Sequence, residues 1–445
     1  MSGRSLGGNY RRLWTASVVS NLGDGLALVA YPWLASSITR SPIAIAGVAV
    51  ATRLPWLLFT LPAGVITDRV DRRRLVAGMD TIRFVLTLVV GLIVLVGSDG
   101  LADPAALADG SATGPSGAAL ALVLLYLAAL ALGSAEVLRD NSAQTLLPAI
   151  VAKEDLERAN GRMWGAEMVM NAFVGPPLAG VLIGVSLALP FLVDAGTFAL
   201  AAALVASMTG TFRPTGEAPV ERPRFRTQLA EGFRWLWGHD LLRSLAIALG
   251  LLNALGAMTS AVDVLFAQDV LGLSATGFGL LAISGAVGGV VGSVTGSWIS
   301  DRLGSGGVLA LTMLGSAAAH GAIAVVPSVP LVFAAFVLVA LVGVAWNVVT
   351  VALRQTIVPD ALLGRVNSVY RFFGWGMIPI GSLVGGVLVT VVDAGASREI
   401  ALRTPHAVAA VAHLLVFAWA ASRLSTAKIE AARSAATGPG GATGS

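Results

Sequence analysis

The chain has 445 residues, of which 56% are hydrophobic and only 12% are charged, and its mean hydropathy is +0.81. Soluble domains carry about 25% charged residues, so this composition predicts a protein of the lipid bilayer and excludes a soluble one. The chain has no cysteine, which excludes disulfides, thiolate nucleophiles and thiolate metal sites. Its net charge of +4 lies in short loops, which indicates membrane topology and no nucleic-acid partner.

A helix that crosses a bilayer needs about 20 predominantly apolar residues. Twelve segments qualify, and the first is long enough to be a retained helix and not a cleaved signal peptide. The predicted spans are 14–38, 43–66, 75–96, 118–138, 163–185, 189–209, 241–268, 276–299, 307–326, 331–353, 368–392 and 406–424.

The segment between the sixth and seventh predicted spans is polar and contains three prolines. Its second part, 225–237, interleaves arginine with phenylalanine and tryptophan, which is typical of an amphipathic helix on a membrane surface. The tail from Ser425 ends in small residues, and we expect it to be disordered. Lysine and arginine gather in alternate loops, which predicts that both termini are cytoplasmic.

The second half of the chain repeats the first. Asn21 is matched by Asn253 and Asp68 by Asp301, at nearly the same offset. We therefore predict an all-α membrane protein with twelve transmembrane helices in two pseudo-symmetric six-helix bundles, with the substrate handled between them. The predicted organisation is an N-terminal bundle at 1–211, a cytoplasmic linker at 212–240, a C-terminal bundle at 241–424 and a disordered cytoplasmic tail at 425–445.

A charged loop at 64–74 follows the second span, and 296–304 repeats it without the run of arginines. The glycine allows close helix approach, the aspartate can accept hydrogen bonds from amides at a helix N-terminus, and the arginines can clamp carboxylates. We predict a conformational latch made by Gly64, Asp68, Arg69, Arg72, Arg73, Asp301, Arg302 and, at the end of the fourth span, Arg139. The alternative is that the arginines only enforce topology.

Charged residues inside a span are costly and indicate function. Asp24 lies about 15 Å into the first span, near the middle of the bilayer, and Arg53 lies at a similar depth in the second. We predict that Asp24 and Arg53 pair and that the pair couples transport to protons. The alternatives are a static ion pair and a hydrogen-bonded structural aspartate. Asp80 and Arg83 suit a local pair in the third span.

Aromatic side chains and one asparagine are candidates for a substrate cavity, although aromatic belts at the membrane interface also collect such residues. An aromatic cavity with few charges favours small amphiphilic organic substrates. The candidates are Tyr31, Trp33, Trp56, Phe59, Asn253, Trp346, Phe372 and Trp375. In the fifth span, Gly175, Pro176 and Pro177 predict a bend that suits a gate.

The charged loop resembles the signature loop of the major facilitator superfamily, and 175–180 resembles the Gly-Pro motif of its exporters. With 23–25, 31–34, 53–55, 146–148 and 158–160, these stretches resemble the bacterial drug:proton antiporters, a branch that includes macrolide efflux proteins, mycobacterial multidrug efflux pumps and enterobactin exporters. The resemblance implies a bacterial inner-membrane exporter in which Asp24, Asp68 and Arg69 are functional. The family loop usually has glycine where Asp71 stands, and the outer loop 97–117 is extended.

We predict a monomeric, proton-coupled exporter of small amphiphilic compounds, which needs no cofactor beyond the proton gradient and is not an enzyme. The sequence has no nucleophile elbow, phosphate loop or metal-ligand cluster. The closest alternative is a dedicated siderophore or metabolite exporter. From other classes, a lipid scramblase and a transport-dead membrane receptor also stay open.

Overall fold

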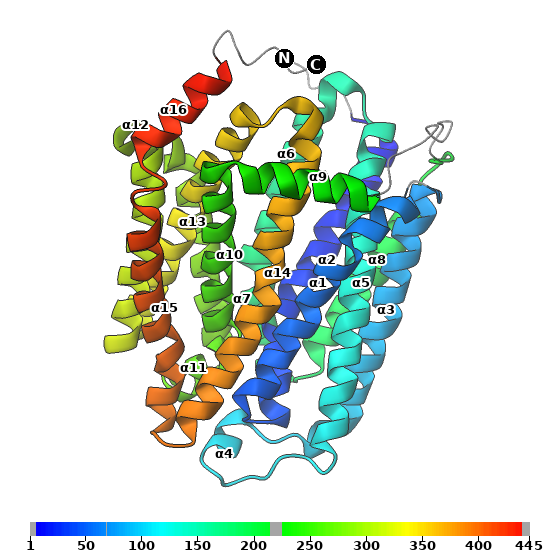
Figure 1. Ribbon diagram of the computed structural model, residues 1–445. Helices are drawn as coiled ribbons and strands as arrows, with labels where there is room; N and C mark the ends of the chain where they lie inside the picture. Colours follow the sequence, from blue (N-terminus) through cyan, green and yellow to red (C-terminus); the bar gives the residue numbers. More distant parts are fainter. Residues whose placement is uncertain (1–5, 68, 214–224, 438–445) are drawn as a thin grey trace. The chain divides into compact units, whose positions relative to one another are not determined.

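The computed structural model describes residues 6–67, 69–213 and 225–437, and within these ranges it contains helices and no β-strand (Figure 1). The chain forms two compact units. Unit 1 comprises Met1–Glu217 and Asp263–Ile283, and unit 2 comprises Ala218–Val262 and Ser284–Ser445. The predicted domain boundaries follow the sequence repeat and stay a prediction.

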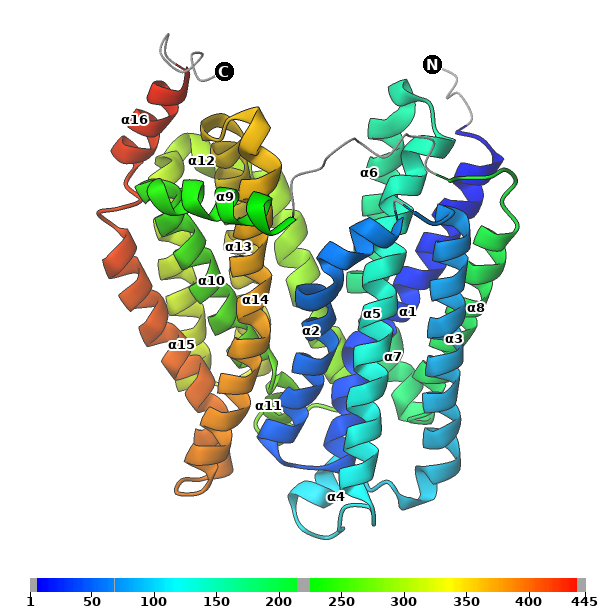
Figure 2. The ribbon, with the colours of Figure 1, turned by 45° about the vertical axis from the view of Figure 1, so that its right-hand side comes forward.

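Unit 1 is built from long apolar helices with short connections, and α2 and α3 each pack against α5 (Figure 2). The α6, π-helical and α7 segments follow one another without a break. The elements are α1 (Gly8–Ile38), α2 (Pro42–Thr67), α3 (Arg72–Gly97), α4 (Pro104–Ala108), α5 (Ala118–Ile150), α6 (Leu156–Glu167), a π-helix (Met168–Val174), α7 (Gly175–Val185), α8 (Leu189–Ala206) and α11 (Asp263–Asp269).

In unit 2, α9 runs across the ends of α10 and α14 (Figure 1), so a helix is present where the sequence predicted an amphipathic one. Gly232 of α9 leaves room for the backbone of Arg365, and Glu231 pairs with the Arg365 guanidinium at 2.5 Å. The elements are α9 (Phe225–Gly238), α10 (Asp240–Ser260), α12 (Ala275–Val325, whose beginning lies in unit 1), α13 (Val329–Ile357), α14 (Asp360–Asp393), α15 (Arg398–Ala420) and α16 (Thr426–Thr437).

Among the described residues, 11 helices or helix pairs are long and apolar enough to cross a membrane. One of them, α12, has 51 residues, and a straight helix of that length would be about 77 Å long, more than twice the thickness of the hydrocarbon core. Gly304 interrupts it with φ 68° and ψ 165°, a backbone conformation open to glycine. Because α12 therefore contains the eighth and ninth predicted spans, the protein has the predicted twelve transmembrane helices.

The predicted disorder of the tail is wrong for Thr426–Thr437, which form α16. Ile429 is fully buried in the core of unit 2, and the Gly306 amide donates to Thr426 Oγ1 at 3.2 Å. An alanine-rich segment with one apolar anchor forms a helix once the neighbouring loop gives it a surface to pack on.

Candidate functional site

Five charged side chains from α1, α3 and α5 form one connected network inside unit 1. Arg83 forms an ion pair with Asp24, and its Nη1 lies 3.6 Å from Asp80 Oδ1. Arg139 lies 3.5 Å from the same oxygen of Asp80 and 3.1 Å from Asp140. Each arginine is therefore shared between two carboxyl groups, and Asp80 joins the two arginines.

One face of α1 supplies the polar groups that hold the arginines. Ser17, Ser20 and Asp24 lie one turn apart along this face. Arg83 donates to Ser20 Oγ at 3.1 Å, and Arg139 donates to Ser17 Oγ at 3.4 Å. The two serines are buried, so the network has a fixed polar wall toward α1.

The opposite wall comes from α8. The Arg83 guanidinium lies over the Phe198 ring, 3.8 Å from its centroid, which stabilises a cation away from water. Asp194 is buried beside it and accepts a hydrogen bond from Thr197 at 3.3 Å. Gly23 of α1 makes room for this pair, since a methyl group there would overlap the side chains of Asp194 and Thr197.

The network contains more acidic than basic groups. Arg83 also interacts electrostatically with Glu136 and Asp194. Two buried arginines therefore face five carboxyl groups, and the exposed Arg53 also acts electrostatically on one of them, Glu136. The five are Asp24, Asp80, Glu136, Asp140 and Asp194. Asp80 is fully buried, whereas the side chains of Asp24 and Asp140 are 21% and 32% exposed. Protein atoms therefore enclose Asp80 completely but leave parts of Asp24 and Asp140 uncovered.

The predicted pairing of Asp24 with Arg53 is wrong, because Asp24 pairs with Arg83. Within the described chain, Arg53 is exposed and forms no ion pair with Asp24. Pro55 faces α5, where Gly133 leaves room for it, and residues two apart in a helix point to nearly opposite sides. The sequence gives the position of Arg53 along α2, but it does not give the rotation of α2 about its axis. The proposed local pair of Asp80 and Arg83 is present.

The charged loop after α2 is fastened by an aspartate that the sequence analysis treated only as a departure. Asp71 caps α3 by accepting the Arg74 amide at 3.1 Å, and its second oxygen accepts the Phe212 amide at 2.9 Å. Burial alone would raise the pKa of the Asp71 carboxyl. The two amide donors and the charge of Arg73 outweigh burial and hold the pKa below its ordinary value.

Among the described residues, the neighbouring arginines donate hydrogen bonds to backbone carbonyls, whereas the latch prediction gave them carboxylates. Arg72 donates to the carbonyl of Thr145 near the end of α5 at 3.1 Å, and Arg73 donates to the carbonyl of Met208 just after α8. Helix C-terminal carbonyls carry partial negative charge and attract cations. The loop is therefore tied to two helix ends of unit 1.

The other predicted latch residues are scattered. Asp68 lies outside the described residues, Gly64 lies in the last turns of α2, and Arg69 is exposed. Asp301 is exposed, and the Arg302 guanidinium lies over the Trp298 ring at 5.0 Å. Arg139 belongs to the buried network described above. A latch role for these residues stays a prediction.

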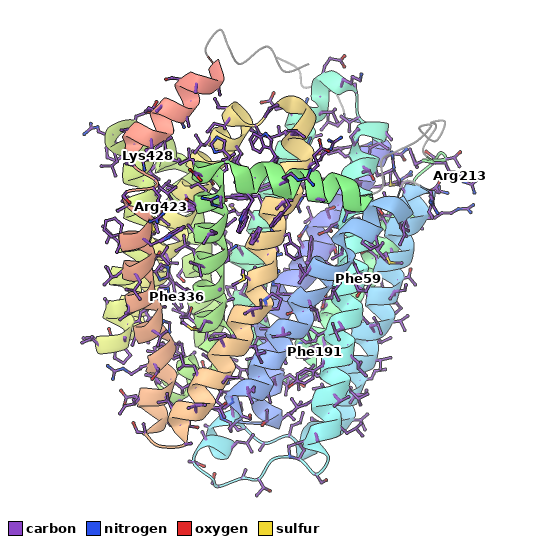
Figure 3. The ribbon with its side chains drawn as sticks, viewed as in Figure 1. Phe59, Phe191, Arg213, Phe336, Arg423 and Lys428 are labelled. Atoms are coloured by element: carbon purple, nitrogen blue, oxygen red, sulfur yellow. The ribbon has the colours of Figure 1, made fainter. Side chains whose placement is uncertain are left out.

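The substrate candidates of unit 1 divide into buried and exposed side chains. Tyr31 and Trp33 are buried, and Tyr31 packs edge-on against Phe191 with ring centroids 5.2 Å apart. Trp56 is partly buried, and Phe59, labelled with Phe191 in Figure 3, is 42% exposed. Phe59 is therefore the most accessible of the four in this conformation.

In unit 2, Trp346 lies in the hydrophobic core and Asn253 donates to the carbonyl of Gly374 at 2.8 Å, which ties α10 to α14. Phe372 and Trp375 are 57% and 40% exposed on α14. Substrate contact by any of these residues stays a prediction.

In the fifth span a π-helix ends directly before Gly175, Pro176 and Pro177, and the bend predicted at these three residues stays a prediction. Wider π-turns inside a span free backbone groups and often mark functional sites. Gly175 also meets Gly25 of α1 backbone to backbone, because a methyl group on Gly175 would lie 2.6 Å from the Gly25 carbonyl carbon. The π-helix and the glycine–proline run thus lie where the backbones of α1 and α7 approach closely.

A polar clasp that the sequence analysis missed holds the end of α1 to α11. Arg40 forms an ion pair with Asp269 and donates to Gln268 Oε1 at 2.6 Å. Gln268 in turn donates to Ser36 Oγ at 2.9 Å. Only the packing reveals this clasp, since isolated polar residues at span ends carry no pattern.

The family model for transmembrane secretion effectors matches residues 7–437, nearly the whole chain. The chain belongs to this family of the major facilitator superfamily. The resemblance noted in the sequence is thereby confirmed, and the protein is a multi-pass membrane transporter by family.

Curated relatives in this family include named efflux proteins. The multidrug efflux pump Tap of Mycobacterium tuberculosis (strain ATCC 25618 / H37Rv) is 29% identical over 388 residues, which cover 84% of this chain and 85% of Tap. The enterobactin exporter EntS of Citrobacter koseri is 26% identical over 365 residues, which cover 81% of this chain and 80% of EntS.

Solved structures support the fold. A bacterial homologue of the human lysosomal transporter Spinster, in an inward-facing conformation, matches with a TM-score of 0.68 at 16% identity, covering 97% of this chain and 98% of the homologue. The nucleoside transporter NupG matches with a TM-score of 0.67 at 13% identity, covering 93% of this chain and 98% of NupG. At these identities the likeness extends to the fold alone.

Proposed function

We propose that this transporter is a proton-coupled exporter of small amphiphilic compounds, working as a multidrug antiporter by alternating access. The observation that carries the proposal is the buried network of two arginines and five carboxyl groups in unit 1. Net negative charge inside a membrane protein is costly, so such a network favours binding protons. The lean toward export comes from the names of the relatives Tap and EntS.

The network suggests how a proton exerts its effect. Asp24 is partly exposed and holds Arg83, which already lies 3.6 Å from Asp80. The oxygens of Asp80 accept no hydrogen bond from the described residues. Protonation of Asp24 weakens its attraction for Arg83, and the guanidinium then moves toward Asp80. In this proposal the motion of Arg83 relative to α1 links proton binding to a change of helix packing.

The proposal includes a bacterial inner-membrane location, cytoplasmic termini, a monomer and no cofactor apart from the proton gradient. Exposed aromatic residues such as Phe59, Phe372 and Trp375 favour amphiphilic aromatic substrates, among them antibiotics. The name of EntS favours one second candidate, a dedicated siderophore exporter.

The test is efflux of a fluorescent cationic dye from proteoliposomes with an imposed proton gradient. We expect gradient-driven efflux by the wild type, gradient-independent efflux by Asp24→Asn, and wild-type behaviour in the control Glu157→Gln, which alters an exposed acid of α6. Equal gradient dependence in wild type and Asp24→Asn would show that Asp24 is structural. If the wild type moves no dye of a varied panel but exports a siderophore, the dedicated exporter is correct.

A further inference from the structure

Three of the four histidines of the chain lie together inside unit 2, apart from the charge network. His320 of α12 and His406 and His413 of α15 are each at most 4% exposed. The Nδ1 atoms of His320 and His406 are 3.1 Å apart, and the ring centroids of His320 and His413 are 5.5 Å apart. Phe336 of α13, labelled in Figure 3, covers the cluster with its ring 6.4 Å from that of His406.

The contact between the Nδ1 atoms of His320 and His406 determines which ring nitrogens of these two residues carry a proton. At 3.1 Å one nitrogen must donate and the other accept, so neutral His320 and His406 are opposite tautomers. His413 Nδ1 lies 2.6 Å from the carbonyl of Ala409 and therefore carries its proton there, which leaves Nε2 as the basic atom. The neutral cluster thus contains ring nitrogens that can accept a further proton.

The surroundings of His320 contain no compensating charge among the described residues. The groups that act electrostatically on His320 are the other two histidines. Charged groups on the helices packed around it lie at the helix ends and bind elsewhere: Arg403 to Glu399 and to the carbonyls of Ala324 and Val325, Asp393 to Arg398, Asp240 to Arg243, and Arg354 to Asn367. Within the described chain, a proton on the cluster therefore has only the neighbouring imidazoles to share its charge, through the 3.1 Å contact between the Nδ1 atoms of His320 and His406.

Within its half of the chain, the histidine cluster occupies the same position as the charge network does in unit 1. There, the third and sixth spans, α3 and α8, meet at Arg83, Phe198 and Asp194. In unit 2 the third and sixth spans, the second part of α12 and α15, meet at the histidines. Thr312 and Ser316, both buried, continue the same face of α12 toward its other end. Ionisable groups therefore occupy the same interface in both halves.

We propose that His320, His406 and His413 form a second proton-binding site of the transporter, which takes up a single proton shared between the imidazoles of His320 and His406. The site lies roughly 8 Å, about one and a half turns, from Val325 at the end of α12 that is predicted to face outward. The proton comes from water on that side and returns to water, and only N–H bonds form and break. The use of the site in coupling rests on the proposed function, whereas proton binding itself does not.

The experiment is NMR of the full-length protein in lipid nanodiscs with labelled histidine. With four histidines in the chain, His239, which lies outside the predicted spans, serves as the internal reference. We expect opposite tautomers for His320 and His406 at neutral pH, and uptake of one proton by the cluster as the pH falls from about 7 to about 4, because burial without a counter-charge opposes the charged form. Single His→Gln variants assign the signals.

Proton uptake over the same pH interval is also counted with an indicator dye for wild type, His320→Gln/His406→Gln and the control His239→Gln. A loss of about one proton in the double variant relative to the wild type supports the site, and His239→Gln shows how large a loss the removal of one titrating histidine outside the predicted spans causes. The proposed site would be overturned if His320, His406 and His413 stay neutral until the protein unfolds, or if the double variant takes up as many protons as the wild type. Neither the NMR titration nor the proton count requires transport. Failure of the proposed export function and failure of the proposed proton site can therefore be distinguished. If the double variant does not fold, the tautomers and titration of the wild type decide alone.

Discussion

At the scale of single residues, the network in unit 1 depends on one arginine. Arg83 contacts Asp24, Asp80, Ser20 and the Phe198 ring while only 3% of its side chain is exposed. A buried guanidinium with this many partners shares its single positive charge between two carboxyl groups. Its removal leaves acidic groups without a counter-charge.

Arg83→Met should therefore destabilise the protein by about 3–5 kcal/mol, the cost of breaking a buried ion pair from one side. Thermal unfolding of the purified protein in detergent measures the loss. The double variant Arg83→Met/Asp24→Asn should recover part of it, because the unpaired charge of Asp24 is gone. Arg53→Met, which alters an exposed arginine of α2, is the control and should melt like the wild type. Equal melting of Arg83→Met and wild type would contradict the shared role of Arg83.

Asp71 gives a prediction about pH. Its pKa is lowered in the folded protein, so its stabilising effect is fully present above the ordinary aspartate pKa of about 3.9 and is lost as pH falls through the folded pKa. Asp71→Ala should cost about 0.5–2 kcal/mol at neutral pH, since a helix cap is lost. The melting-temperature difference from wild type should shrink below about pH 4. A difference that stays constant down to the acid limit, or the same pattern in the control Asp301→Ala, would refute this account.

Sequence patterns could place residues along a helix but not around it. The depth of Asp24 and the local pairing of Asp80 with Arg83 were predicted, because both depend on spacing within one helix. The partner of Asp24 depends on the rotation of three helices and the reach of a long side chain. For the same reason the histidine cluster could not be predicted from His320 alone.

At the scale of elements, glycines decide where helices touch. Gly25 and Gly175 bring the backbones of α1 and α7 into contact next to the π-helix, and Gly180 admits Ala275 and Thr276 at the start of α12. Small residues drive helix association in lipid, where apolar bulk gives no advantage. This part of the fifth span is thus held against α1 by close backbone packing.

Gly175→Ala should lower stability by about 1–3 kcal/mol and reduce transport, because the added methyl group would force α1 and α7 apart. Thermal unfolding and dye efflux of the same preparation measure both effects. Gly184→Ala is a matched control in the same helix, since its methyl group would enter open space. Similar effects of the two substitutions would show that the close contact with Gly25 does not matter.

The sequence predicted helices well where a run of apolar residues is long enough to cross the membrane. It predicted them poorly where a segment becomes helical only by packing on another part of the chain. Gly304 was recognised as the end of a repeated loop, and it is the residue that divides α12 into two spans. By contrast, α16 forms because Thr426 and Ile429 find the loop after Gly304 and the core of unit 2. The apolar residues of the tail are not spaced in a regular helical pattern, so the sequence alone favoured disorder.

At the scale of the whole molecule, the repeat and the packing divide the chain differently. Residues Asp263–Ile283 belong to the second repeat but pack in unit 1, and the chain enters this segment directly after α10 ends at Ser260. The clasp of Arg40, Gln268 and Asp269 fastens the segment to α1. In a transporter that alternates between two states, a polar clasp at a span end is a contact that must be released once per cycle.

We therefore expect Arg40→Ala to favour the state in which the α1–α11 contact is open. The chain has no cysteine, so Ser37→Cys, at a position that is 2% exposed, provides a single reporter. A membrane-impermeant maleimide added to intact cells should label this reporter faster in the Arg40→Ala background, because water reaches the released helix end. Ser111→Cys, at an exposed position of the loop that contains α4, should label equally in both backgrounds and controls for expression. If the Ser37→Cys rate is the same with and without Arg40, the clasp is a static brace of unit 1, and the opening of this end depends on other contacts.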